Sequence, residues 1–357
     1  PTAGNDPIWD LPYAYHFDSA LYGRFLRRYS ERLGVVRTEG IVADARRAAG
    51  VGDITALLLK DGRTVAGDLF IDCSGSRGVL IQQHLRTGYE DWDHWLPCDR
   101  AMAVPSERFA TTLPFTRAIA RPAGWQWRIP LQHRNGNGLV YNSRLCSDEQ
   151  AAELLLANLD SKALDDPRII RFRTGRARRQ WHRNVVAVGL SSGFLEPLES
   201  TSIYLIQSAI VRLLHLFPHR GVTDDLVNEY NRQSQLEYEL IRDFIILHYH
   251  INQRRDSPFW RDLRTMEVPE RLARKIALFR ANGTLVQEQL DIFQEPSWVQ
   301  VLMGQGVLPE DWHPAADDPT DAELADQLAQ LAEIKARPLG QLPSHDRFLD
   351  LRTMAAA

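Results

Sequence analysis

The stretch 185–217 constrains the fold most, because an apolar run, a glycine-bearing loop and a helical pattern follow one another there without a break. Residues 185–188 have the length and β-branching of a buried strand. A loop starts at Gly189, and from Thr201 apolar residues recur at helical spacing until Pro218 ends the helix. We therefore predict a strand, a loop and a helix N-terminus. The predicted inner face of the helix is Ile203, Ile206, Ile210, Leu213, Leu214 and Phe217.

The start of this helix has the chemistry of an anion site. Its first turn, Ser200, Thr201 and Ser202, carries unpaired backbone N–H groups and the positive end of the helix dipole. Glu199 directly precedes it, and a carboxylate in that place can accept a proton while an enzyme handles a halide or an oxyanion. A carboxylate there can equally be an ordinary helix cap. The spacing leaves both interpretations open.

The first half of the chain reads as a mixture of helix and strand. Two strands flank an Asp-Gly hairpin signal, and the second runs into Gly75 and Gly78, a turn that either admits a nucleotide or is merely tight. The segment 124–130, GWQWRIP, alternates and predicts a half-buried strand whose tryptophans either pack or wall a flat-ligand cavity. The predicted elements are a connector at 1–15, a helix over 18–33 with Phe25, Leu26 and Tyr29 inward, strands at 35–44, 54–59, 64–72, 101–104, 116–120 and 124–130, and a turn at 135–138 into a strand at 139–143.

The second half is predicted to be mostly helical. Ser147 with Gln150, and Thr320 with Glu323, form capping boxes that start helices. The predicted helices cover 147–159, 223–250, 269–282 and 320–336, and 252–262 is predicted to be a polar loop.

Composition bounds the classes of function. A chain of 357 residues with 44% apolar and 25% charged residues is typical of a globular protein with two subdomains. The net charge of −4 argues against nucleic-acid binding through bulk positive charge, and no apolar run is long enough to cross a membrane. Three widely separated cysteines have no metal-ligand spacing, so we expect no metal site and reduced thiols in the cytoplasm.

One motif points to a different enzyme class. Residues 189–193, GLSSG, match the nucleophile elbow G-x-S-x-G of serine hydrolases. That elbow needs a helix directly after the serine, where Pro197 would remove a hydrogen bond and clash. We therefore reject a hydrolase.

Several strings taken together resemble one family. LFIDCSG, GWQWRIP, VGLSSGFLEPLESTSI, SPFW and FQEPSWVQVLMGQG resemble the flavin-dependent halogenases of the tryptophan-halogenase group, with GWQWRIP similar to the group's W-x-W-x-I-P signature. The resemblance extends from about residue 14 to the C-terminus. It implies an α/β (α+β) fold: a monooxygenase-like FAD-binding module with mixed sheets over 1–220, packed against a helical module over 221–357 that contributes to the substrate pocket.

The resemblance also implies the chemistry. Reduced FAD and O₂ would oxidise chloride or bromide to hypohalous acid, which passes along a tunnel to a lysine and halogenates an electron-rich, indole-type ring. A separate flavin reductase would supply FADH₂, and a homodimer is compatible with the family. The implied site is catalytic Glu199 and Ser200, halide-binding Thr201 and Ser202, cofactor-binding Gly75, Gly189, Leu195, Pro197 and Ile203, barrier residues Trp125 and Trp127, and substrate-binding His248, Tyr249, Arg255, Phe259 and Trp260.

The chain departs from the family pattern in four respects. It has no G-x-G-x-x-G, and none of its four lysines, Lys60, Lys162, Lys275 and Lys335, has the matching context. We therefore expect about one domain, roughly 150 residues, to be missing, and the 357 residues alone to bind FAD poorly and not to halogenate. Arg255 stands where tryptophan-specific members place an acid for the substrate's ammonium group, so indole, an indole derivative or a carboxylate-bearing aromatic is expected instead of tryptophan. Ser202 replaces a frequent glycine, which backbone halide binding should tolerate.

Two alternatives stay open beside the halogenase. One is a flavin monooxygenase that hydroxylates without halide. The other is an inactive fragment that serves as a binding or dimerisation module, which exposed apolar surface would favour.

Overall fold

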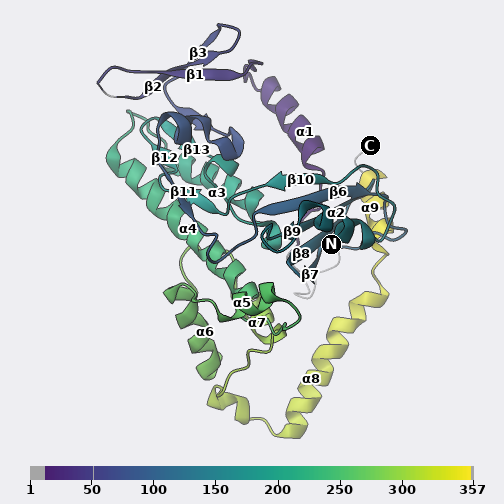
Figure 1. Cartoon of the computed structure of the whole chain (residues 1–357). Helices are drawn as coiled ribbons and strands as arrows, with labels where there is room; N and C mark the ends of the chain where they lie inside the picture. Colours follow the sequence, from purple (N-terminus) through teal and green to yellow (C-terminus); the bar gives the residue numbers. More distant parts are fainter. Residues whose placement is uncertain (1–12, 51, 355–357) are drawn as a thin grey trace.

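The computed structural model describes residues 13–50 and 52–354, and most of the predicted connector at 1–15 lies outside them. In Figure 1 a small sheet stands at one end of the molecule, and a long helix, α4, runs from beside it toward a group of shorter helices. A larger sheet lies to one side of α4, and α8 forms a separate arm with no buried residue. Within residues 13–50 and 52–354, no helix combines the length and the apolarity needed to cross a bilayer.

The strands within the described residues form four sheets. The largest is antiparallel, with the order β10-β6-β9-β8-β7, and the other three are β1-β2-β3, β14-β11-β5 and β12-β13-β4. The strands are β1 Val42–Arg47, β2 Ile54–Leu59, β3 Thr64–Ala66, β4 Phe70–Asp72, β5 Tyr89–Asp91, β6 Arg100–Ser106, β7 Arg117–Arg121, β8 Gly124–Pro130, β9 Asn135–Tyr141, β10 Arg168–Arg171, β11 Gly175–Ala177, β12 Trp181–His182, β13 Val185–Ala187 and β14 Gly193–Phe194.

The helices include every one predicted in the second half. They are α1 Ser19–Arg32, α2 Asp148–Ala157, α3 Ser202–His215, α4 Asp224–His250, α5 Pro258–Thr265, α6 Glu270–Asn282, α7 Glu295–Gly304, α8 Asp321–Ala336 and α9 His345–Met354. Both predicted capping boxes are present, at Ser147 and Thr320, and Asp18 caps α1. The C-terminal half of α4 is the centre of the largest core, because Ile241, Ile245 and neighbouring residues are almost fully buried there.

The predicted buried strand is β13, and it pairs in parallel with β4. Val185 and Val186 contribute to two different cores, one on each side of the β12-β13-β4 sheet. Burial on both sides explains the unbroken apolar run. The segment 64–72 is therefore two strands in different sheets: β3 completes the predicted hairpin with β2, whereas β4 joins β13. The strand predicted at 35–44 starts only at Val42.

Three other local predictions were wrong. Strand β8 is buried on both faces, since Gln126 and Arg128 are buried as well as Trp125, so alternation did not mean a half-buried strand. Its partner β9 already begins at Asn135, and the turn lies at 131–134. The segment predicted to be a loop at 252–262 contains the start of α5, which Ser257 caps.

The inner faces predicted for two helices were also wrong. Phe25, Leu26 and Tyr29 on α1 are 50%, 40% and 48% exposed, and α1 has no buried residue. The buried face of α3 contains only Leu213 from the predicted set. It is made of Leu205, Ala209, Arg212 and Leu213, whereas Ile203, Ile210, Leu214 and Phe217 are exposed. Apolar residues surround much of α3, so its pattern alone could not select the face that packs.

Candidate active site

The loop before α3 ends in a tight turn. Pro197–Glu199 forms a 3₁₀ turn, and Ser200 follows it in the left-handed region with φ of +55°. Helix α3 then begins with Thr201 as its N-cap, and no side chain caps it. Of the predicted first turn, only Ser202 is helical, since Thr201 is the N-cap and Ser200 precedes it. The absence of a capping side chain leaves the first-turn N–H groups available to another acceptor.

Glu199 is held by a histidine and does not cap the helix. Its Oε1 lies 2.8 Å from Nε2 of His248, a residue near the end of α4. Nδ1 of the same ring lies 2.8 Å from the Phe244 carbonyl oxygen and donates to it. Because both ring nitrogens then face oxygen acceptors, the pair shares one further proton, either as imidazolium with carboxylate or as imidazole with carboxylic acid. The arrangement suits a group that accepts and releases protons.

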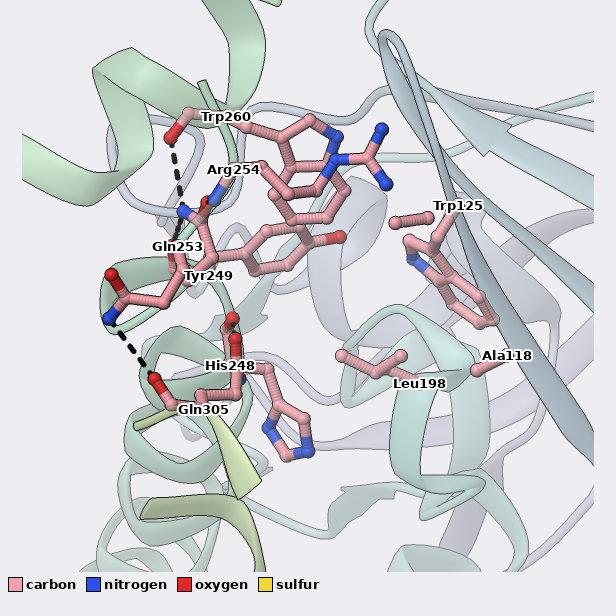
Figure 2. Close-up of a pocket in the computed structure, with 11 residues that line it drawn as sticks. Ala118, Trp125, Leu198, His248, Tyr249, Gln253, Arg254, Trp260 and Gln305 are labelled. Atoms are coloured by element: carbon pink, nitrogen blue, oxygen red, sulfur yellow. Dashed lines mark hydrogen bonds between the residues drawn. The ribbon is translucent and has the colours of Figure 1, made fainter. Parts of the chain in front are cut away.

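A cavity of about 250 Å³ opens beside this pair. It is small for a ligand pocket, and its walls combine aromatic rings, small residues and a few polar groups. Figure 2 shows the His248 imidazole and Leu198 at one end of the pocket, and Tyr249 and Trp125 on opposite sides of it. The residues that line it are Ala118, Ala120, Trp125, Leu198, His248, Tyr249, Asn252, Gln253, Arg254, Trp260 and Gln305.

The two predicted barrier tryptophans lie in different settings. Trp125 is buried and lines the pocket, with its ring centre 6.1 Å from that of Trp127. Trp127 packs against the core and is not among the lining residues. Its ring lies flat over Gly138 of β9, where a Cβ atom would come within 2.0 Å of it. The absence of a side chain at Gly138 therefore allows this indole to cross the sheet.

The predicted substrate residues are only partly brought together. Tyr249 stacks on Trp260 with ring centres 5.6 Å apart, and Trp260 donates from Nε1 to the Arg121 carbonyl oxygen. Phe259 packs edge-on against Trp260 but is buried in the core and does not line the pocket.

Arg255, the basis of the predicted substrate preference, is exposed and does not line the pocket. Its neighbour Arg254 does, pairs with Asp256, and lies over the Trp260 ring at 5.5 Å. The side chain of Arg254 therefore takes the place expected for that of Arg255.

Glu196, for which no role was predicted, is a carboxyl group buried beside the pocket. It is 1% exposed, and its Oε2 accepts hydrogen bonds from Trp125 Nε1 at 3.1 Å and from the Tyr249 hydroxyl at 2.8 Å. Burial raises the pKa of this carboxyl to about 7, although both hydrogen bonds and the nearby His248 oppose the rise. A signal existed in the sequence, since Glu196 lies between the apolar Leu195 and a proline.

The predicted cofactor residues gather where the parallel strands end. Gly75 follows β4 and Gly189 follows β13, both with φ of +73°, and the two turns are neighbours. A Cβ on Gly75 would meet nothing within 4 Å, and one on Gly189 would meet only Ile206 at 3.7 Å. Open backbone at the carboxyl ends of parallel strands is where flat nucleotide cofactors bind in α/β folds, so these residues fit an FAD.

The other three predicted cofactor residues differ in exposure. Pro197 is half-buried at the start of the 3₁₀ turn, and Ile203 is 42% exposed in the first turn of α3. Leu195 is 2% exposed in the main core, so only its backbone could reach a cofactor.

None of the four lysines lines the pocket. Lys60, Lys162 and Lys335 are exposed. Lys275 is buried, pairs with Asp291 at 3.1 Å and lies over the Trp298 ring.

Two solved structures with this fold are flavin-dependent halogenases. Xcc4156, a flavin-dependent halogenase from Xanthomonas campestris, superposes with a TM-score of 0.93 at 49% identity, over 94% of this chain and 68% of that one. BrvH, a flavin-dependent halogenase from Brevundimonas sp. BAL3, gives 0.92 at 47% identity over the same shares. The fold is thus the one found in flavin-dependent halogenases.

Sequence comparison identifies the family. The tryptophan halogenase family model matches residues 1–321, and tryptophan 7-halogenase RebH of Lentzea aerocolonigenes is 35% identical over 94% of this chain and 68% of its own length. Tryptophan 6-halogenase SttH of Streptomyces toxytricini is 37% identical over 84% of this chain. The chain belongs to the tryptophan halogenase family. It spans 58% of the length of SttH and 68% of that of RebH.

Proposed function

We propose that this protein halogenates an electron-rich, indole-type aromatic, using FADH₂ from a flavin reductase, O₂ and chloride or bromide. The observation that carries the proposal is the Glu199–His248 pair at the end of a pocket walled by aromatic rings. Bound FAD would supply the two-electron oxidation of halide to hypohalous acid, and Gly75, Gly189 and Pro197, with the backbone of Leu195 and with Ile203, would contact it.

The residues of the site would then manage halide and protons. The free N–H groups at Thr201 and Ser202 would hold the halide, which the α3 dipole favours. Hypohalous acid would transfer its halogen to a ring carbon, and the hydroxide left behind would take a proton from water and depart as water. Glu199 would accept the ring proton and then return it to solvent, which restores the carboxylate. Glu199 would also stabilise the cationic ring while both substituents are present. His248 would hold the carboxyl in place, and Ser200 would shape the backbone between Glu199 and the halide.

The substrate we propose is indole or an indole derivative with an anionic arm. Arg254 lines the pocket beside Trp260. Arg121 lies near Arg254, because burial and then the positive charges of Arg128 and Arg254 lower the pKa of Arg121. Positive charge at the pocket would repel the ammonium group of tryptophan and attract a carboxylate. This preference therefore rests on Arg254 and Arg121 instead of Arg255.

The test is product formation with a flavin reductase and NADH, run on the 357-residue chain and on the longest natural form of the protein. Indole, tryptophan and indole carboxylates compete in one mixture, with bromide, with chloride and without halide. From the longest natural form we expect halogenated indoles or indole carboxylates, formed only with halide. From the 357-residue chain alone we expect no halogenated product. A hydroxylated product without halide would show a monooxygenase, and a clear preference for tryptophan would overturn the substrate proposal.

A binding or dimerisation role is the second candidate, and the exposed apolar side chains of α1 and α3 favour it. Light scattering of the purified chain would detect a dimer. Replacing Phe25 and Tyr29 with Ser should then yield monomers, whereas the same change at Leu328 on the α8 arm should not.

A further inference from the structure

We propose that Glu196 is a positioning residue of the pocket: one oxygen of its buried carboxyl accepts hydrogen bonds from both Trp125 and Tyr249 and so fixes the two rings that stand on opposite sides of the substrate. This assignment rests on the proposed function only for the identity of the ligand. The hydrogen bonds themselves are features of the protein.

The geometry ties three separate elements together at one atom. Trp125 comes from β8, Tyr249 from α4, and Glu196 from the loop between β14 and the 3₁₀ turn. Figure 2 shows the Tyr249 hydroxyl pointing across the pocket toward the indole of Trp125. A shared acceptor at that point sets the separation and the tilt of both rings. Since both rings line the pocket, the width of the slot for an aromatic ligand depends on Glu196.

The two oxygens of the Glu196 carboxyl differ in their hydrogen bonds. Oε2 receives both donors, whereas Oε1 is buried and has no hydrogen-bond partner among the described residues. A fully ionised carboxylate with one orphan oxygen is costly to bury. A carboxylic acid places its proton on Oε1 and keeps Oε2 as the acceptor for both rings. The arrangement therefore accommodates the neutral form and keeps both hydrogen bonds.

Few titratable groups face Glu196. They are Tyr249 and His248 from α4 and Cys98 from the segment before β6, while Glu199 in the same loop turns to His248. Burial raises the pKa of Cys98 and Tyr249 well above their usual values, so both stay neutral near pH 7. Glu196 is thus the group near the two rings whose charge we expect to change around pH 7.

A Glu196 carboxyl with a purely structural role would be buried in the same way. The test must therefore measure the Trp125 ring and ligand binding directly. The readout is the indole ¹⁵N–¹H signal of Trp125, assigned with Trp125→Phe and followed from pH 5.5 to 8.5. Indole affinity is measured on the same samples by calorimetry. Glu196→Gln keeps an acceptor without a titratable proton, and Glu196→Leu removes the acceptor.

We expect the Trp125 signal to titrate with a midpoint near 7 in the unmodified protein. The titration should vanish in Glu196→Gln while indole affinity stays within about threefold. In Glu196→Leu the signal should move to the position of an unbonded indole N–H, and indole should bind at least tenfold more weakly. A factor of ten corresponds to the loss of one well-placed hydrogen bond.

Further variants keep the test decisive. If Glu196→Leu does not fold, Tyr249→Phe deletes one donor and should shift the Trp125 signal and weaken indole binding about threefold or more. His248→Asn should leave the Trp125 titration in place, because the titrating group is Glu196. Unchanged indole affinity in Glu196→Leu, or a Trp125 titration that persists in Glu196→Gln, would overturn the assignment.

The test separates the two proposals. A protein that forms no halogenated product but shows the expected Trp125 behaviour retains the positioning role and loses the proposed function. Halogenation with a Trp125 signal that ignores Glu196 gives the reverse result.

Discussion

The two ends of the turn before α3 carry the same chemical group in opposite surroundings. Glu196 enters the 3₁₀ turn from extended backbone, is 1% exposed, and meets only uncharged hydrogen-bond donors. Glu199 leaves the turn at the pocket side, is about 30% exposed, and meets an imidazole with which it shares a proton. Burial without a charged partner favours a neutral carboxyl, whereas a histidine partner favours proton exchange. The difference assigns positioning to one and proton transfer to the other.

The largest expected difference between the two carboxyls is in catalysis, and neutralising Glu199 tests it. Glu199→Gln should lower kcat for halogenation by about 10²- to 10⁴-fold, the usual worth of a general acid–base group. Indole affinity should change little, because the aromatic side chains that wall the pocket are unaltered. Steady-state product analysis with a flavin reductase checks this. Glu229→Gln, at a partly exposed position of α4 that does not line the pocket, is the matched control. A Glu199→Gln protein within tenfold of the control would contradict the proton-acceptor role.

The pH dependence of stability distinguishes the two carboxyls a second time. The pKa of Glu196 is about 7 in the folded protein against 4.5 ordinarily, so the folded state keeps a proton that the unfolded state loses between those values. Stability from this group is complete below about pH 4.5 and is lost as the pH rises to about 7, by on the order of 3 kcal/mol. Urea unfolding at pH 5 and pH 8 should show this loss relative to Glu196→Gln. Equal pH dependence in the two proteins would show that Glu196 is ionised throughout.

His248 links the two regions, because it bonds Glu199 and its charge lowers the pKa of Glu196. His248→Asn should reduce kcat about tenfold through the loss of the group that holds the Glu199 carboxyl, a change of about 1.4 kcal/mol in the barrier. The same variant should raise the midpoint of the Trp125 titration, since a positive charge near Glu196 is gone. Kinetics and the indole signal check the two effects separately. A fall in that midpoint would contradict the charge coupling.

Local structure was predictable wherever neighbours in the chain determine it. The capping boxes at Ser147 and Thr320 and the N-cap at Asp18 depend on residues within one turn, and all three are present. The parallel pairing of β4 with β13 joins segments more than a hundred residues apart, so the single strand predicted over 64–72 became two. The same limit explains α3, whose packing face is chosen by the strands and helix beside it.

The pocket has the same limit: its local motif was predictable from the sequence, and its long-range contacts were not. The string around Glu199 pointed to the correct loop, and the flanking Leu195 and Pro197 were a signal for the burial of Glu196. The sequence did not indicate that its carboxyl would accept hydrogen bonds from Trp125 and Tyr249. Gln305 and Arg254 line the pocket from distant elements, and only folding brings them there. The string FQEPSWVQVLMGQG contains Gln305, so the resemblance held a signal for it without indicating a contact. Side chains that converge from different elements are the part of a site that one sequence specifies least directly.

The smallest expected effect concerns the halide, at the Glu199 end of the turn. Backbone N–H groups at Thr201 and Ser202 are proposed to hold the ion, so Ser202→Gly should keep the halide KM within about twofold. Glycine is tolerated near a helix N-terminus and retains the N–H group. Ser202→Ala is the matched control, because it removes the hydroxyl but keeps helix propensity. Bromide titrations of product formation measure both variants. A tenfold rise in KM for Ser202→Gly and for Ser202→Ala would show that the hydroxyl binds the ion. The Glu199 end would then depend on side chains as strongly as the Glu196 end does.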